Sequence, residues 1–113
     1  MMPTYEALQA RFDAGDILVM DGGMGSEIQR RGVPLSRSTW SARAVSTHPE
    51  LVRDITTDFI RAGAEIVIAN TYSTGKTTLA RAGRAEESEQ YNRSAVQLAL
   101  EAREAAHANH PVW

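Results

Sequence analysis

Cysteine is absent from this 113-residue sequence. The chain therefore supplies no disulfide, no thiol nucleophile and no thiolate ligand for a metal ion. Long apolar runs are missing too, since none approaches the roughly 20 residues that cross a bilayer. The opening stretch MMPTYEALQARFDAGD carries acidic side chains and lacks the apolar core of a secretory leader. We therefore expect a cytoplasmic protein with no membrane partner.

Basic residues are not in excess. The chain has 12 lysines and arginines against 14 acidic residues, which gives a formal net charge of −2. Surfaces that bind nucleic acid carry a clear basic excess, so we expect no nucleic-acid partner. The length suits at most one domain and falls short of the roughly 250 residues of a (β/α)₈ barrel.

The apolar pattern predicts amphipathic helices that alternate with short strands. The run ILVM at 17–20 is typical of a strand buried on both faces, and Leu51, Ile55 and Phe59 form the apolar stripe of a long helix. The predicted helices cover residues 4–14, 24–31, 49–62 and 86–106, and the predicted strands cover 17–20, 65–69 and a stub at 112–113. Such alternation implies parallel strands with right-handed crossovers. The fold class is therefore α/β, with residues 1–113 forming a single partial domain of a larger fold.

A long irregular connection covers residues 32–47. Loops of this length are uncommon inside compact domains and are often functional. Trp40 is its one bulky residue, and we expect this side chain to pack against the body of the protein. Thr47 and Glu50 have the spacing of a capping box, in which the threonine caps the helix that follows.

The stretch Gly75-Lys76-Thr77 follows a predicted strand and has the final residues of a phosphate-binding loop. The motif G-x-x-x-x-G-K-[ST] requires a first glycine at position 70, where the sequence has Asn70. Asparagine tolerates left-handed backbone geometry, but the four residues after it are bulky for a loop that wraps phosphates. A phosphate-loop nucleotide-binding module is therefore one hypothesis, and a helix start with an exposed lysine is the other.

A second glycine-containing stretch, Asp21-Gly22-Gly23, follows the first predicted strand. Its glycines lack the spacing of a dinucleotide-binding loop. The carboxylate of Asp21 can accept hydrogen bonds from an ammonium group, and the bare amides after it can approach a small anion such as a carboxylate. The stretch could therefore hold the two charged groups of an amino acid, or it could simply form a tight turn. Because parallel strands end at one edge, Asp21 and Asn70 are expected to be neighbours.

Three motifs in order resemble the N-terminal part of the homocysteine S-methyltransferases. They are DGGMGSE after the first strand, HPELV at the start of the long helix, and AGAEIVIANTY along the second strand. The resemblance covers roughly residues 15 to 113. The order and spacing of the three motifs are more specific than any one of them.

This resemblance implies a (β/α)₈ barrel, of which the chain would supply about two to three βα units. It also implies a methyltransferase in which zinc activates the thiolate of homocysteine to attack a methyl donor and give methionine. By the same resemblance, Asp21 contacts the amino group of homocysteine. The residues expected to bind this substrate are Asp21, Gly22, Gly23, Asn70, Thr71 and Tyr72.

The absence of cysteine is the main departure from the family. The resemblance implies three cysteine ligands for zinc late in the barrel, so we expect these ligands beyond the end of this chain. The segment alone is then expected to be inactive and could self-associate through its incomplete sheet. A catalytically silent remnant of the barrel, stable only beside partner chains, is an alternative.

Overall fold

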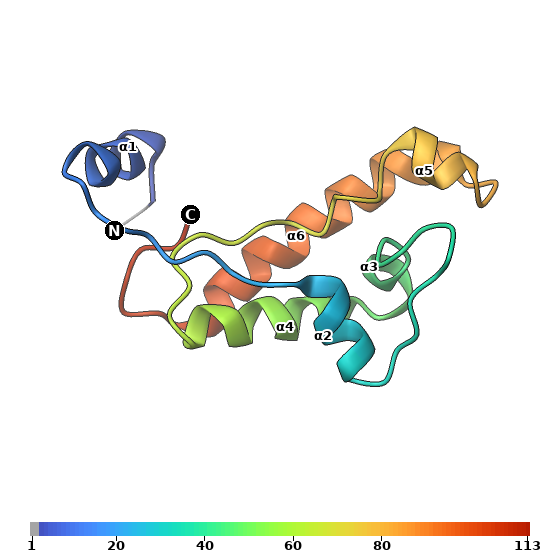
Figure 1. Ribbon diagram of the computed structural model, residues 1–113, viewed down its shortest axis with the longest axis horizontal. Coiled ribbons are helices and arrows are strands. Elements are labelled where there is room, and N and C mark those ends of the chain that lie inside the picture. The colour runs from blue at the N-terminus through green and yellow to red at the C-terminus, as the bar shows by residue number, and fades with distance from the viewer. Residues whose placement is uncertain (1–2) are drawn as a thin grey trace.

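The computed structural model describes residues 3–113, and helices dominate it (Figure 1). The helices are α1 (Tyr5–Asp13), α2 (Met24–Arg30), α3 (Ala44–Thr47), α4 (Pro49–Arg61), α5 (Lys76–Ala80), the 3₁₀ turn η1 (Ala85–Glu87) and α6 (Ser88–Ala106). All four predicted helices are present, with boundaries shifted by at most two residues. None of the helices in this part of the chain combines the length and apolar character needed to cross a bilayer.

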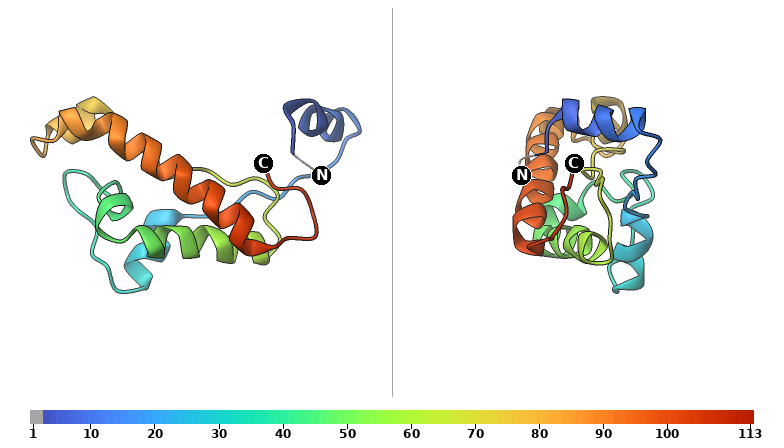
Figure 2. Two further views of the ribbon diagram at one scale, coloured as in Figure 1. Left: turned by 180° about the vertical axis from the view of Figure 1, so that it is seen from behind. Right: turned by 90° about the vertical axis from the view of Figure 1, so that its left-hand side faces the viewer.

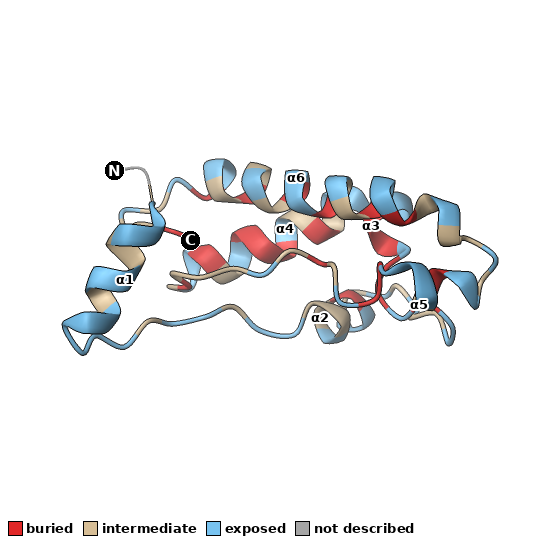
Figure 3. Cartoon of the chain, turned by 90° about the horizontal axis from the view of Figure 1, so that it is seen from above, coloured by how far each residue is buried: buried red, intermediate tan, exposed pale blue. Residues whose placement is uncertain are grey.

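Helices α4 and α6 lie side by side and form most of the core, and their buried sides face each other (Figure 3). On α4, Val52 and Ile55 are buried, and Phe59 packs against the same core. On α6, the predicted face is buried as expected, and it consists of Tyr91, Ala95, Leu98 and Ala102. Alanines on this face let the two helices approach closely, which explains the packing of a long helix with few large apolar residues.

The predicted capping box is wrong. Thr47 is the last residue of α3, and its hydroxyl donates to the carbonyl of Arg43 at 3.0 Å. His48 precedes α4 and gives no side-chain cap. The physical reason is that a Thr hydroxyl already turned back onto its own helix cannot cap the next one. Pro49 at the first position of α4 also removes one amide that would need a partner.

Three extended segments run parallel beside these helices: the first segment (residues 18–21), the second segment (65–68) and the third segment (112–113). The amide of Ile66 donates to Val19 O at 3.2 Å, and the amide of Asp21 donates to Ile66 O at 2.9 Å. On the other side, Trp113 N donates to Glu65 O at 2.8 Å. The second segment therefore lies between the other two, in the order expected for successive parallel strands.

The predicted burial of the first strand on both faces is wrong. Ile17 is 88% exposed and Met20 is 51% exposed. The first segment lies at the outer edge of the three, while α4 and α6 cover the group from one side (Figure 2). Pairing is limited to short stretches of backbone, so the described residues contain extended segments and bridges rather than complete barrel units.

Candidate functional site

A pocket of about 240 Å³ lies where the first and second segments end. Four of the six predicted substrate-binding residues line it, namely Asp21, Gly22, Asn70 and Tyr72. Gly23 and Thr71 stand next to it in the chain but do not line it. The remaining lining residues are Met24, Gly25, Trp40, Ser41, Ile68 and Ala69.

Asp21 is the charged group of this pocket. One carboxylate oxygen, Oδ2, accepts a hydrogen bond from the amide of Ile68 at 3.0 Å. Burial raises the pKa of the Asp21 carboxyl above its ordinary value, while the bond from Ile68 acts in the opposite direction. A partly buried carboxylate whose ionised form is disfavoured gains most from a cationic partner. A cationic group such as an ammonium is therefore a suitable hydrogen-bond partner for Asp21 at this pocket.

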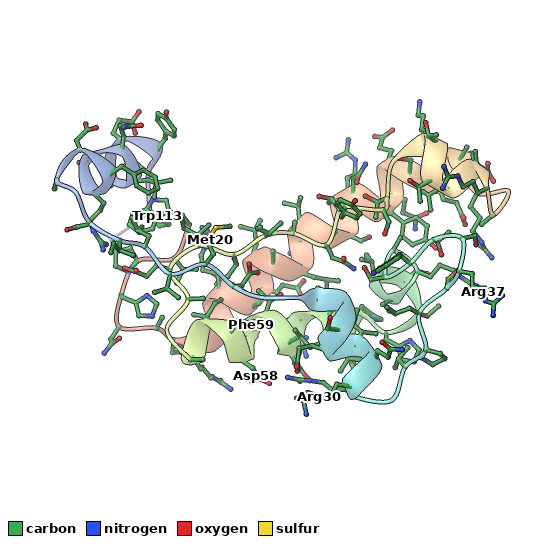
Figure 4. All side chains as sticks on the ribbon, in the orientation of Figure 1. Met20, Arg30, Arg37, Asp58, Phe59 and Trp113 are labelled. Carbon is green, nitrogen blue, oxygen red and sulfur yellow. The ribbon has the colours of Figure 1, made fainter. Side chains whose placement is uncertain are left out.

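Gly22 lies against α4. A Cβ atom at this position would stand 2.9 Å from the ring of Phe59, closer than real contacts allow. Phe59 extends from the side of α4 that faces the first segment (Figure 4). The glycine lets backbone and ring approach closely, and any larger residue here would force the Phe59 ring to move.

Asn70 is buried and engages the long connection instead of facing a ligand freely. Its Oδ1 accepts from the hydroxyl of Ser41 at 3.1 Å, and its Nδ2 donates to Ser41 O at 3.0 Å. These two bonds fasten residues 32–47 to the end of the second segment. The sequence indicated only that the connection is unusually long, so it did not predict that Ser41 bonds to Asn70.

Trp40 packs against the body only in part: the residue is 61% exposed, while its indole lies against Gly25, where an added Cβ would stand 3.0 Å from Nε1. Its backbone is in the left-handed region, with φ of 54°. Two backbone bonds with Ser36, of 3.1 and 2.9 Å, close the turn that holds this conformation. Left-handed geometry at a bulky residue costs about 1–3 kcal/mol and is concentrated at functional sites. Trp40 lines the pocket, as does the 95% exposed Tyr72.

The loop that leads into α5 does not have the geometry of a phosphate cradle. The amide of Thr71 donates to Ala69 O at 2.7 Å, and the hydroxyl of Thr74 donates to Thr71 O at 3.1 Å. The carbonyl of Thr74 in turn accepts from the hydroxyl of Ser88 at 2.6 Å. These bonds turn the loop inward toward α6, and Lys76 is exposed at the start of a five-residue helix.

We accordingly expect the chain to show no measurable binding of ATP or GTP, and Lys76→Ala to change nothing in such an assay. Calorimetric titration of either nucleotide checks this. Saturable binding in the micromolar range that disappears in Lys76→Ala would instead establish the phosphate-loop hypothesis.

The described residues do not fit a thiolate zinc site. The sequence has no cysteine, and no three histidine, aspartate or glutamate side chains gather as metal ligands anywhere in residues 3–113. Among the residues that line the pocket, Asp21 alone carries a charge, and its carboxylate can accept hydrogen bonds from a cationic group.

Comparison with known proteins decides the family. The family profile of homocysteine S-methyltransferase matches residues 18–113. This chain belongs to the homocysteine S-methyltransferase family. The homocysteine S-methyltransferase of Escherichia coli strain K12 is 39% identical over 111 residues, which are 97% of this chain and 36% of that protein. The selenocysteine Se-methyltransferase of Brassica oleracea var. italica is 34% identical over 100 residues, covering 88% of this chain and 29% of that protein.

The fold is similar to that of a solved enzyme in this family. The crystal structure of the metallated form of the homocysteine methyltransferase MmuM from Escherichia coli matches with a TM-score of 0.77 and 35% identity. The match covers 92% of this chain and 38% of that chain. The chain thus spans about a third of the length of these relatives.

Proposed function

We propose that this chain is the amino-acid-binding segment of a homocysteine S-methyltransferase. The observation that carries the proposal is the partly buried carboxylate of Asp21 at the edge of a pocket whose other walls include Gly22 and Asn70. Relatives of the chain are named for the methylation of homocysteine and of selenocysteine. Both amino acids carry an ammonium group, which the partly buried carboxylate of Asp21 can accept as a hydrogen-bond donor.

In the proposed binding mode, Asp21 accepts hydrogen bonds from the ammonium group of homocysteine. The substrate carboxylate lies near the bare backbone at Gly22, where side-chain bulk is excluded by Phe59. Asn70 holds Ser41 and Trp40 in place and so shapes the pocket from the side of the long connection. The whole reaction is transfer of a methyl group from a donor to the substrate sulfur, which forms an S–C bond as the donor's bond to that methyl breaks.

Zinc has no thiolate ligands in these residues, so the chain's own share of the reaction is binding and orientation. We propose that the cysteine ligands, the rest of a (β/α)₈ barrel and the methyl-donor site lie in sequence beyond this chain, and that the enzyme acts in the cytoplasm. The second candidate is a catalytically silent remnant of the barrel.

A chimera separates these two candidates. Residues 1–113 would replace the aligned third of the Escherichia coli homocysteine S-methyltransferase, and methionine formation from homocysteine would be measured with S-methylmethionine as donor. An amino-acid-binding segment restores activity, and the Asp21→Asn version of the chimera raises the KM for homocysteine. A folded chimera that does not bind homocysteine would identify the segment as a silent remnant.

We also propose that the isolated chain self-associates. Apolar side chains on the first and second segments are exposed, among them Val19 at 55% and Ile68 at 57%. Exposed apolar surface next to unpaired backbone favours association. Sedimentation velocity at several protein concentrations is expected to show species heavier than 12.4 kDa, whereas a monomer at all concentrations would contradict the proposal.

A further inference from the structure

Two carboxylates occupy opposite ends of the short pairing between the first and second segments. At one end, Asp21 Oδ2 accepts from the amide of Ile68 at 3.0 Å. At the other end, Glu65 Oε2 accepts from the amide of Val19 at 3.2 Å. Asp21 has a place in the proposed function, but Glu65 lies away from the pocket and has none.

Both carboxylates stand where a parallel ladder would continue through backbone atoms. With Met20 paired to Ile66, evenly spaced parallel bonds would next join the amide of Ile68 to the carbonyl of Asp21. In the other direction they would join the amide of Val19 to the carbonyl just before the second segment. Side-chain oxygens take both amides instead. The backbone amide of Glu65 also donates to Val19 O at 2.7 Å. Glu65 therefore bonds to both the backbone amide and the backbone carbonyl of Val19.

Glu65 is itself fixed by α1. Its Oε1 accepts from Nη1 and Nη2 of Arg11, each at 3.2 Å, and Arg11 also pairs with Asp16. The amide of Val19 and the guanidinium of Arg11 lower the pKa of the Glu65 carboxyl, which therefore stays ionised. The Glu65 side chain is only 17% exposed.

The two ends of α1 are attached to different segments. Arg11, near the end of α1, reaches Glu65 on the second segment, while the indole Nε1 of Trp113 donates to Thr4 O at 2.8 Å just before α1 begins. Trp113 lies beside α1 in Figure 4. The helix is thus held in place relative to the paired backbone, and it gives Glu65 a fixed orientation.

We propose that Glu65, held by Arg11, is a positioning residue that sets the register of the first segment and thereby aims the Asp21 carboxylate into the pocket. The proposal rests on the proposed function of Asp21. Val19 lies two residues, about 6.6 Å of strand, before Asp21. Pairing through a single bridge specifies register weakly, and a slip of one residue would turn Asp21 to the opposite face.

Amide hydrogen exchange of the 113-residue chain tests the coupling. Glu65→Met removes the acceptor, and we expect exchange at Val19 and at the more distant Ile68 to become about tenfold faster. Glu65→Gln retains an acceptor oxygen and is expected to restore part of the protection. Glu89→Met is the matched control, because Glu89 is a 77% exposed partner of Arg93 on α6. It should change neither amide.

If Glu65→Met also removes protection from the amides of α4, the variant has lost its fold and a second variant is needed. Arg11→Met serves for this, because it keeps the Glu65 carboxylate but removes the guanidinium that holds it. Faster exchange at Ile68 in Arg11→Met, with α4 still protected, supports the proposal. Unchanged exchange at Ile68 in Arg11→Met, or full exposure of both amides in the unsubstituted chain, overturns it.

The kinetics of the chimera separate this proposal from the function of Asp21. We expect Glu65→Met to raise the KM for homocysteine at an unchanged kcat. If Asp21→Asn raises the KM while Glu65→Met does not, Asp21 binds substrate and the positioning role of Glu65 is wrong. If neither raises it, the proposed function itself fails.

Discussion

Asp21→Asn is expected to weaken homocysteine binding by roughly 10- to 100-fold, because it removes the negative charge of a charge-assisted hydrogen bond worth about 1.5–3 kcal/mol. The amide retains an oxygen that can accept from Ile68 N, so the free energy of unfolding should barely change. Titration of homocysteine into the chimera, or its KM there, measures the effect. Asp54→Asn, the same substitution at a carboxylate whose side chain is 59% exposed on α4, is the control.

The affinity for homocysteine is also expected to depend on pH through Asp21. Burial raises the pKa of Asp21 above its ordinary 3.8, so the affinity for the ammonium group is present above that raised pKa and lost as the pH falls through it. Ionisation of Asp21 correspondingly costs stability as the pH rises through the same value. Asp21→Asn should lack the acid limb of the binding curve. An unchanged KM and an unchanged pH profile would remove Asp21 from the substrate site.

Asn70→Ala is expected to destabilise the chain by about 2–3 kcal/mol, because it leaves the hydroxyl and the carbonyl of Ser41 without the partners they have in the structure. Ser41→Ala removes only one donor and should cost about 1 kcal/mol. Thermal unfolding at one fixed protein concentration measures both losses.

Asn109→Ala serves as the matched control for this prediction, since Asn109 is exposed between α6 and the third segment. It should leave the unfolding midpoint unchanged. Additive effects of Asn70→Ala and Ser41→Ala would contradict the paired geometry, because residues that bond to each other show coupling of at least 0.5 kcal/mol or so in a double-mutant cycle.

Sequence periodicity predicted the parts of the fold that are set by local pattern. The apolar stripe of α4 and the tyrosine–alanine–leucine face of α6 are buried as predicted. The meeting of Asp21 and Asn70 followed from a topological argument, that parallel strands end at one edge, and the pocket confirms that they are close.

The parts that depended on tertiary context could not be predicted. Thr47 has the sequence spacing of a helix cap, but it ends the short helix α3, and its hydroxyl donates to the carbonyl of Arg43. Trp40 is apolar and large, which favours burial, yet it is 61% exposed in a turn closed by two backbone bonds with Ser36. The bond between Ser41 and Asn70 joins residues 29 positions apart, and no local sequence pattern predicts such a contact.

We propose that these residues bind the amino-acid end of homocysteine but do not activate its thiol. The most direct measurement is a methionine-formation assay on the isolated 113-residue chain, with added zinc and with S-methylmethionine, betaine or methyltetrahydrofolate as donor. We predict no methyl transfer from any of the three, since the chain has no cysteine to bind zinc as thiolate. Methionine formed by the chain alone would contradict the claim.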